Sequence, residues 1–160
     1  MTENKMFCFQ CQETAKGTGC TIKGVCGKEA ETSKWQDLLL SVVRGVGTIQ
    51  HTLGENASKE VADFLVDALF STITNANFDD QSILNKVDTG IALKKQLLET
   101  ALSKNITFPN YQEVHWGGEK SDYSAEGERE GVLRNENADL IKPKKWTHVA
   151  VSIYNIKRAA

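Results

Sequence analysis

The stretch from Cys8 to Gly27 reads C-F-Q-C-Q-E-T-A-K-G-T-G-C-T-I-K-G-V-C-G and holds all four cysteines of the 160-residue chain. The spacing C-x2-C-x8-C-x5-C gathers them within nineteen residues, as Cys8, Cys11, Cys20 and Cys26. Thiolates are soft ligands, and four of them on one loop can bind a zinc ion or an iron–sulfur cluster. Interspersed glycines let the backbone approach such a group closely. The four cysteines are therefore the candidate metal ligands.

Other uses of these thiols fit the sequence less well. The chain begins Met-Thr-Glu-Asn-Lys, without the apolar segment of a secretory signal, so we expect a reducing, cytoplasmic location that disfavours disulfides. A thioredoxin-type C-x-x-C site would need a βαβ pattern around it, and none surrounds this one. Structural zinc sites usually space each cysteine pair by two to four residues, and the second pair here is C-x5-C. Spacing alone favours an iron–sulfur cluster and leaves zinc open.

Composition limits the function further. Forty per cent of the residues are apolar and 25% are charged, as in ordinary globular domains. The net charge of −2 disfavours a nucleic-acid or anionic-membrane partner, which would require a basic face. No run approaches the roughly eighteen apolar residues of a membrane span. The length suits one ordinary domain or two small ones.

Apolar periodicity predicts a mainly α fold. Apolar residues recur at three- and four-residue steps over roughly 34–53, 58–75 and 80–102. We expect Thr32 or Ser33 to cap the first helix, Ser58 the second, and Asp79 or Asp80 to begin the third. The third helix is expected to break near 88–90, at Asp-Thr-Gly. Short connections between three helices predict an antiparallel bundle.

These patterns divide the chain into five segments. Residues 1–5 are a flexible leader, 6–28 the cluster loop, 29–104 the helical bundle, 105–130 a connecting segment and 131–160 a return segment. Within the connection, we expect a short helix, a Trp116 that anchors the loop onto the bundle, and a solvated run of Glu126, Glu128 and Glu130. Pro143 breaks any helix in the return segment. A helix is preferred over a strand for its last residues.

Residues 6–28 read M-F-C-F-Q-C-Q-E-T-A-K-G-T-G-C-T-I-K-G-V-C-G-K and closely resemble the N-terminus of the hybrid-cluster proteins, also called prismane proteins or hydroxylamine reductases. The resemblance covers roughly residues 6–139 and is strongest over 6–28. It implies a [4Fe–4S] cluster bound by Cys8, Cys11, Cys20 and Cys26. A second class of the family, with wider cysteine spacing, carries a [2Fe–2S] cluster instead. The resemblance also implies that the helices are part of the first domain of that fold.

The resemblance implies an electron-entry role. In the family, the [4Fe–4S] cluster takes electrons from a redox donor protein and passes them to a hybrid iron–sulfur–oxygen cluster in later domains, where hydroxylamine is reduced. No cysteine follows Cys26, and His51, His115 and His148 form no catalytic pair, so no catalytic residue is assigned. We expect the chain alone to be inactive and its partners to be the donor and the C-terminal domains. The alternatives are a structural zinc helical binding module and a free-standing ferredoxin-like carrier or sensor.

Overall fold

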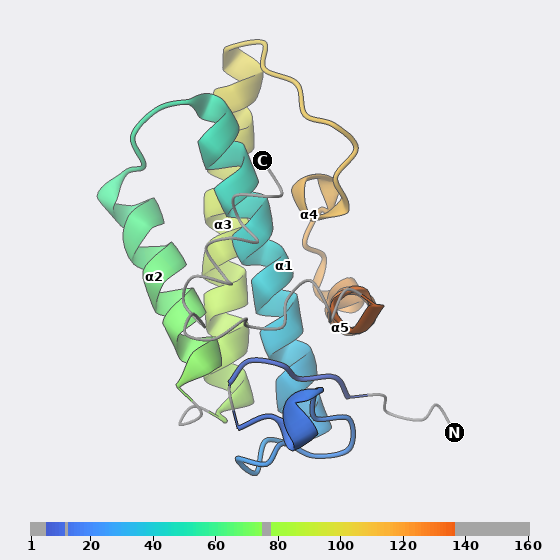
Figure 1. Cartoon of the computed structure of the whole chain (residues 1–160). Coiled ribbons are helices and arrows are strands. Elements are labelled where there is room, and N and C mark those ends of the chain that lie inside the picture. Colours follow the sequence, from blue (N-terminus) through green and yellow to red (C-terminus); the bar gives the residue numbers. More distant parts are fainter. Residues whose placement is uncertain (1–5, 12, 75–77, 137–160) are drawn as a thin grey trace.

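Three long helices form the body of the protein. The computed structural model describes residues 6–11, 13–74 and 78–136. Helices α1 (Ala30–Leu53), α2 (Lys59–Ile73) and α3 (Asp80–Ser103) pack side by side with short connections, as an antiparallel bundle (Figure 1). The mainly α fold predicted from the sequence is confirmed. None of the helices in the described part of the chain is both long and apolar enough to cross a membrane.

The helix starts agree with the sequence at two of three places. The Ser58 hydroxyl accepts a hydrogen bond from the backbone N–H of Val61, and the Asp79 carboxylate accepts from the first turn of α3, as predicted. Helix α1 instead begins at Ala30, before the predicted Thr32 or Ser33. The Thr32 hydroxyl donates to Asp80 Oδ1 at 2.7 Å. This bond ties the first turn of α1 to the first turn of α3.

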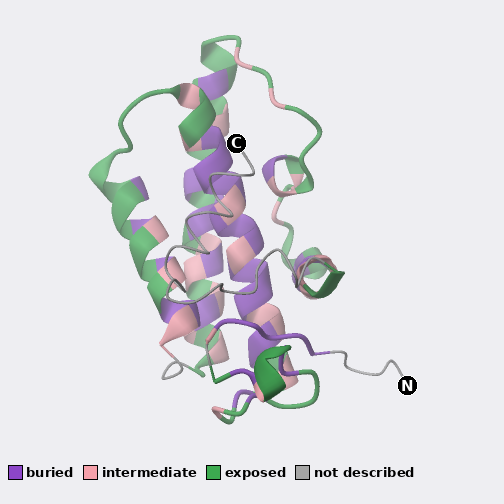
Figure 2. Ribbon diagram, viewed as in Figure 1, coloured by how far each residue is buried: buried purple, intermediate pink, exposed green. Residues whose placement is uncertain are grey.

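The core lies between the three helices, with α1 at its centre. Figure 2 shows buried residues along most of α1, whereas α2 and α3 are exposed on their outer faces. The main buried cluster contains apolar side chains from all three helices and one tyrosine, namely Leu38, Leu39, Val42, Val43, Val46, Val61, Phe64, Ala68, Ile83, Val87, Ile91, Leu93 and Tyr123. Burial of this apolar surface is the main favourable contribution to folding.

The predicted break in the third helix is wrong, because α3 runs unbroken through residues 88–90. A Cβ at Gly90 would lie 2.3 Å from Phe64 Cζ and 2.6 Å from Val42 Cγ1. Glycine is therefore present for close packing, at a cost of about 1 kcal/mol in helix propensity relative to alanine. Asp88 accepts hydrogen bonds from Tyr123 Oη at 2.5 Å and Lys120 Nζ at 3.0 Å. Its side chain holds the following segment onto α3.

The chain after α3 returns along α1. It forms α4 (Gln112–His115), a short 3₁₀ helix η2 (Lys120–Asp122) and α5 (Tyr123–Glu136), which packs against α1 (Figure 1). Trp116 packs against the main core, as predicted. Helix α5 is longer than the short helix expected in this region. The limits of the five segments stay predictions, and the last 24 residues, including Pro143, lie outside the described residues.

The prediction that Glu126, Glu128 and Glu130 form a solvated run is wrong for two of the three residues. Glu128 is exposed, but Glu126 and Glu130 are 4% and 1% exposed because they face α1. Ser41 donates to Glu126 at 2.6 Å, and Arg44 donates to Glu130 at 2.7 Å. The charge of these carboxylates is balanced by arginines on α1 and α5, so the interface between the two helices is ionic.

Candidate metal centre

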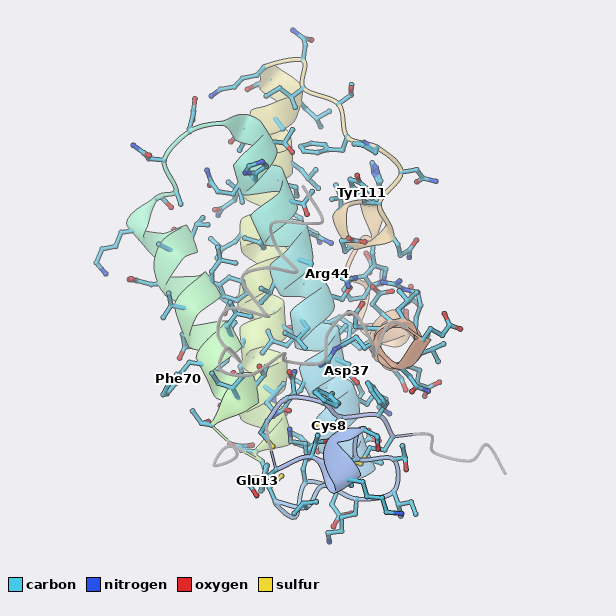
Figure 3. The ribbon with its side chains drawn as sticks, viewed as in Figure 1. Cys8, Glu13, Asp37, Arg44, Phe70 and Tyr111 are labelled. Atoms are coloured by element: carbon cyan, nitrogen blue, oxygen red, sulfur yellow. The ribbon has the colours of Figure 1, made fainter. Side chains whose placement is uncertain are left out.

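The cysteine loop lies against the N-terminal end of α1 (Figure 3). Met6, Cys8 and Cys20 form a second buried cluster, with Ala15 and Ala30 packed against it. Ala30 is the first residue of α1. The positive end of the helix dipole is therefore next to the loop, and it favours negative charge on nearby thiols.

Two of the cysteines are held opposite each other by the backbone. The N–H of Cys8 donates to the carbonyl of Cys20, and the N–H of Cys20 donates to the carbonyl of Cys8, both at 2.9 Å. This exchange is a hydrogen-bonded antiparallel pair. The loop thereby brings together residues that are twelve positions apart in the sequence.

Polar groups surround the sulfur of Cys20. The backbone N–H of Ala15, in the 3₁₀ helix η1 (Ala15–Gly17), donates to Cys20 Sγ at 3.4 Å, and Thr14 Oγ1 lies 3.6 Å from it. Burial raises the pKa of Cys20, but hydrogen bonds from the Ala15 and Val25 backbone and from Thr14, with the charge of Lys28, bring it below its usual value. The site therefore favours the thiolate, the form that binds metals.

The sulfur of Cys8 has a charged neighbour. Lys28 Nζ donates to Cys8 Sγ at 3.4 Å and to Gln36 Oε1 at 2.5 Å. The Lys28 side chain is 1% exposed. A buried ammonium beside the sulfur stabilises a negative charge there.

The other two cysteines are half-buried, and all four are free thiols. Cys26 lies within a tight turn in which the N–H of Gly27 donates to the carbonyl of Gly24 at 2.8 Å. A Cβ on Gly24 would lie 3.1 Å from Cys26 Sγ. Glycine at this position lets the backbone pass close to the sulfur.

The chemistry of the loop fits a thiolate-bound group. Gln10 lies between Cys8 and Cys11, and its buried Nε2 has no hydrogen-bond partner among the described residues. A buried, unpaired donor is unfavourable, and an acceptor such as a cluster sulfide would satisfy it. Among the described residues, no three His, Cys, Asp or Glu side chains are grouped closely enough to hold a metal ion. Binding therefore requires the sulfurs to move closer together, and the four-cysteine ligand set stays a prediction.

The sequence did not single out two polar residues of this site. Lys28 follows the last Cys-Gly pair directly, and Gln10 stands inside the C-x-x-C pair. Their positions next to the cysteines could have pointed to them, but only their burial in the structure distinguishes them from surface residues. His51 and His115 are exposed and lie outside the loop, and His148 is outside the described residues.

Fold and site together define a helical module with a thiol-rich loop at one end of its central helix. Residues 6–154 match the model of the Prismane/CO dehydrogenase family. The chain belongs to this family.

Relatives named hydroxylamine reductase are similar to most of this chain. The hydroxylamine reductase of Bacteroides fragilis strain YCH46 is 44% identical over 149 residues, and that of Bacteroides thetaiotaomicron is 45% identical over 146 residues. These alignments cover 91% and 89% of this chain. The hydroxylamine reductase of Nitratidesulfovibrio vulgaris is 39% identical over 144 residues, or 84% of the chain. In each case the alignment covers 26% of the relative, so the chain spans about a quarter of the length of these relatives.

Proposed function

We propose that this chain is the electron-entry part of a hydroxylamine reductase. Cys8, Cys11, Cys20 and Cys26 would bind a [4Fe–4S] cluster, and electrons would pass through it from a redox donor protein to a hybrid cluster held outside this chain. The observation that carries the proposal is the loop itself: it holds four free thiols next to the start of α1, it pairs the backbones of Cys8 and Cys20, and hydrogen-bond donors contact the sulfurs of these two residues. Membership of the family favours an iron–sulfur cluster over zinc.

A bound cluster would supply one-electron transfer between the donor and the next centre. The protein's own residues do three things for it. The backbone pair of Cys8 and Cys20 holds two ligands in register. The N–H of Ala15 and the ammonium of Lys28 donate to sulfur, and such bonds favour the more negatively charged state. Phe7 and Phe9, which are 5% and 8% exposed, add apolar surface that limits the access of water.

The donor protein would meet the outer surface of the loop. Ile22 and Val25 are 87% and 63% exposed, and they lie between Cys20 and Cys26 in the sequence. Exposed apolar residues next to a redox centre are suited to a brief docking contact. We place this work in the cytoplasm, where thiols remain reduced.

Reduction of hydroxylamine would need the remainder of the enzyme. The sequence has no cysteine after Cys26 to bind a second cluster. We therefore expect the 160-residue protein to exchange electrons without turning over hydroxylamine. Robust turnover by the purified chain would overturn this assignment.

The test is a two-step electron transfer under anaerobic conditions. The purified protein is reduced with dithionite, freed of excess reductant, and examined by electron paramagnetic resonance. It is then mixed with oxidised cytochrome c as a generic acceptor. We expect a paramagnetic signal that disappears as the acceptor is reduced, with about one electron transferred per chain. A colourless protein that contains zinc and transfers no electrons would establish the zinc-module alternative instead.

A further inference from the structure

Lys28 is a buried lysine at the end of the cysteine loop. Its side chain is 1% exposed, and lysine is almost never buried to that extent unless it is paired. In the part of the chain that the structure describes, Lys28 forms no ion pair with Asp or Glu. Its ammonium donates to Cys8 Sγ at 3.4 Å and to Gln36 Oε1 at 2.5 Å. The buried carboxyl of Asp37 interacts electrostatically with Lys28 without contacting it as an ion pair, and a negative charge on Cys8 Sγ would stabilise the buried ammonium further.

The surroundings fix the ammonium in place. Gln36 is on the second turn of α1 and is 2% exposed, so the amide that accepts from Lys28 has little freedom. The backbone carbonyl of Lys28 accepts a hydrogen bond from the N–H of Gly24 at 2.8 Å. Both ends of the residue are thus held, one by the loop and the other by the helix.

We propose that Lys28 sets the reduction potential of the cluster by placing a fixed positive charge and a hydrogen-bond donor on its Cys8 ligand. This inference rests on the proposed function. The reduced cluster carries one more negative charge than the oxidised cluster, and a nearby cation in a poorly solvated site stabilises that charge. Lys28 therefore raises the reduction potential and makes the cluster easier to reduce.

The loop offers a matched control. Lys23 is also a lysine of the cysteine loop, but its side chain is 55% exposed and it pairs with Glu29 at the surface. Water and salt screen such a charge. Replacement of Lys23 removes the same formal charge from the loop and leaves the buried ammonium in place.

The experiment compares midpoint potentials of the wild-type protein with those of Lys28→Met, Lys28→Gln, Lys28→Arg and Lys23→Met. Iron and sulfide are measured first in every sample, and potentials follow from a spectroscopic redox titration. We expect the Lys28→Met change to shift the redox equilibrium constant at least tenfold toward the oxidised form, about 59 mV for one electron. Lys28→Gln should shift it in the same direction. Lys28→Arg and Lys23→Met should remain near the wild-type value.

The outcomes separate the inference from the proposed function. A wild-type protein without iron and sulfide contradicts the proposed function, and the inference fails with it. If the wild-type protein carries the cluster, and a fully loaded Lys28→Met or Lys28→Gln protein has the same midpoint potential as the wild type, the inference about Lys28 is contradicted and the proposed function is not. Loss of the cluster from both neutral variants, with retention in Lys28→Arg, also overturns it, because Lys28 would then serve cluster assembly.

Discussion

Glu130 of α5 accepts a hydrogen bond from Arg44 of α1, at 2.7 Å between Nη2 and Oε2, while its side chain is only 1% exposed. Glu130→Gln removes the charged acceptor and leaves the half-buried Arg44 with the more distant Glu113 carboxylate at 3.9 Å, so we expect it to lower the free energy of unfolding by about 1–3 kcal/mol. Urea unfolding at neutral pH measures the change.

The same helix supplies the control for this prediction. Glu128 is exposed, so Glu128→Gln removes an equal charge and should change the stability by less than about 0.5 kcal/mol. Equal effects of the two substitutions would show that α5 does not bury Glu130 against α1 in solution.

Gly90 lies where α3 packs closely against Phe64 of α2 and Val42 of α1. Gly90→Ala adds a methyl group that would lie 2.3 Å from Phe64 Cζ, and overpacking of this kind typically costs about 1–3 kcal/mol. The gain in helix propensity offsets about 1 kcal/mol of this loss. We expect a net destabilisation of up to about 2 kcal/mol in thermal or urea unfolding. Thr89→Ala, at an exposed neighbouring position, should be nearly neutral. A more stable Gly90→Ala protein would contradict this packing.

Because Lys94 is buried, we expect the stability of the protein to depend on pH in the alkaline range. Its Nζ donates to the backbone carbonyls of Glu113 and Trp116, and burial lowers the pKa of Lys94 to about 8, against the opposing charges of Glu126 and Glu113. In the unfolded chain the pKa is about 10.4. Between these values the unfolded state binds more protons than the folded state, so the free energy of unfolding rises with pH.

The Lys94→Met variant isolates this contribution. We expect the wild-type protein to gain about 3 kcal/mol relative to Lys94→Met as the pH rises from about 8 to about 10.4. The raised pKa of Tyr123 acts in the opposite direction, but it is present in both proteins and cancels. Lys59→Met, at an exposed site, should run parallel to the wild type. Parallel curves for Lys94→Met as well would show that the ammonium is not buried.

The sequence predicted those parts of the fold that depend on local pattern. Apolar periodicity located three helices, and the caps Ser58 and Asp79 were found from residue type alone. The break expected near Gly90 was wrong because helix propensity says nothing about the side chains packed against a glycine. The burial of Glu126 and Glu130 was missed for a similar reason, since Ser41 and the half-buried Arg44, which donate hydrogen bonds to them, are about 85 residues away in the sequence.

For the site too, local sequence pattern predicted some features, and others depended on contacts made only in the folded protein. The spacing of the four cysteines and the resemblance over residues 6–28 identified the loop, and the family membership is confirmed. The roles of Lys28 and Gln10 could not be predicted, because an isolated lysine or glutamine is normally solvated and only the folded loop shows that these two are buried. The ligand set and the cluster type remain predictions.

The central claim is tested most directly by iron, sulfide and zinc analysis of the anaerobically purified protein, with an absorption spectrum of the same sample. We predict about four irons and four sulfides per chain and a broad absorption at about 400 nm. The Cys20→Ser protein should lose the iron, the sulfide and this absorption. About one zinc ion per chain without sulfide would contradict the electron-entry account and leave a helical binding module with a structural metal.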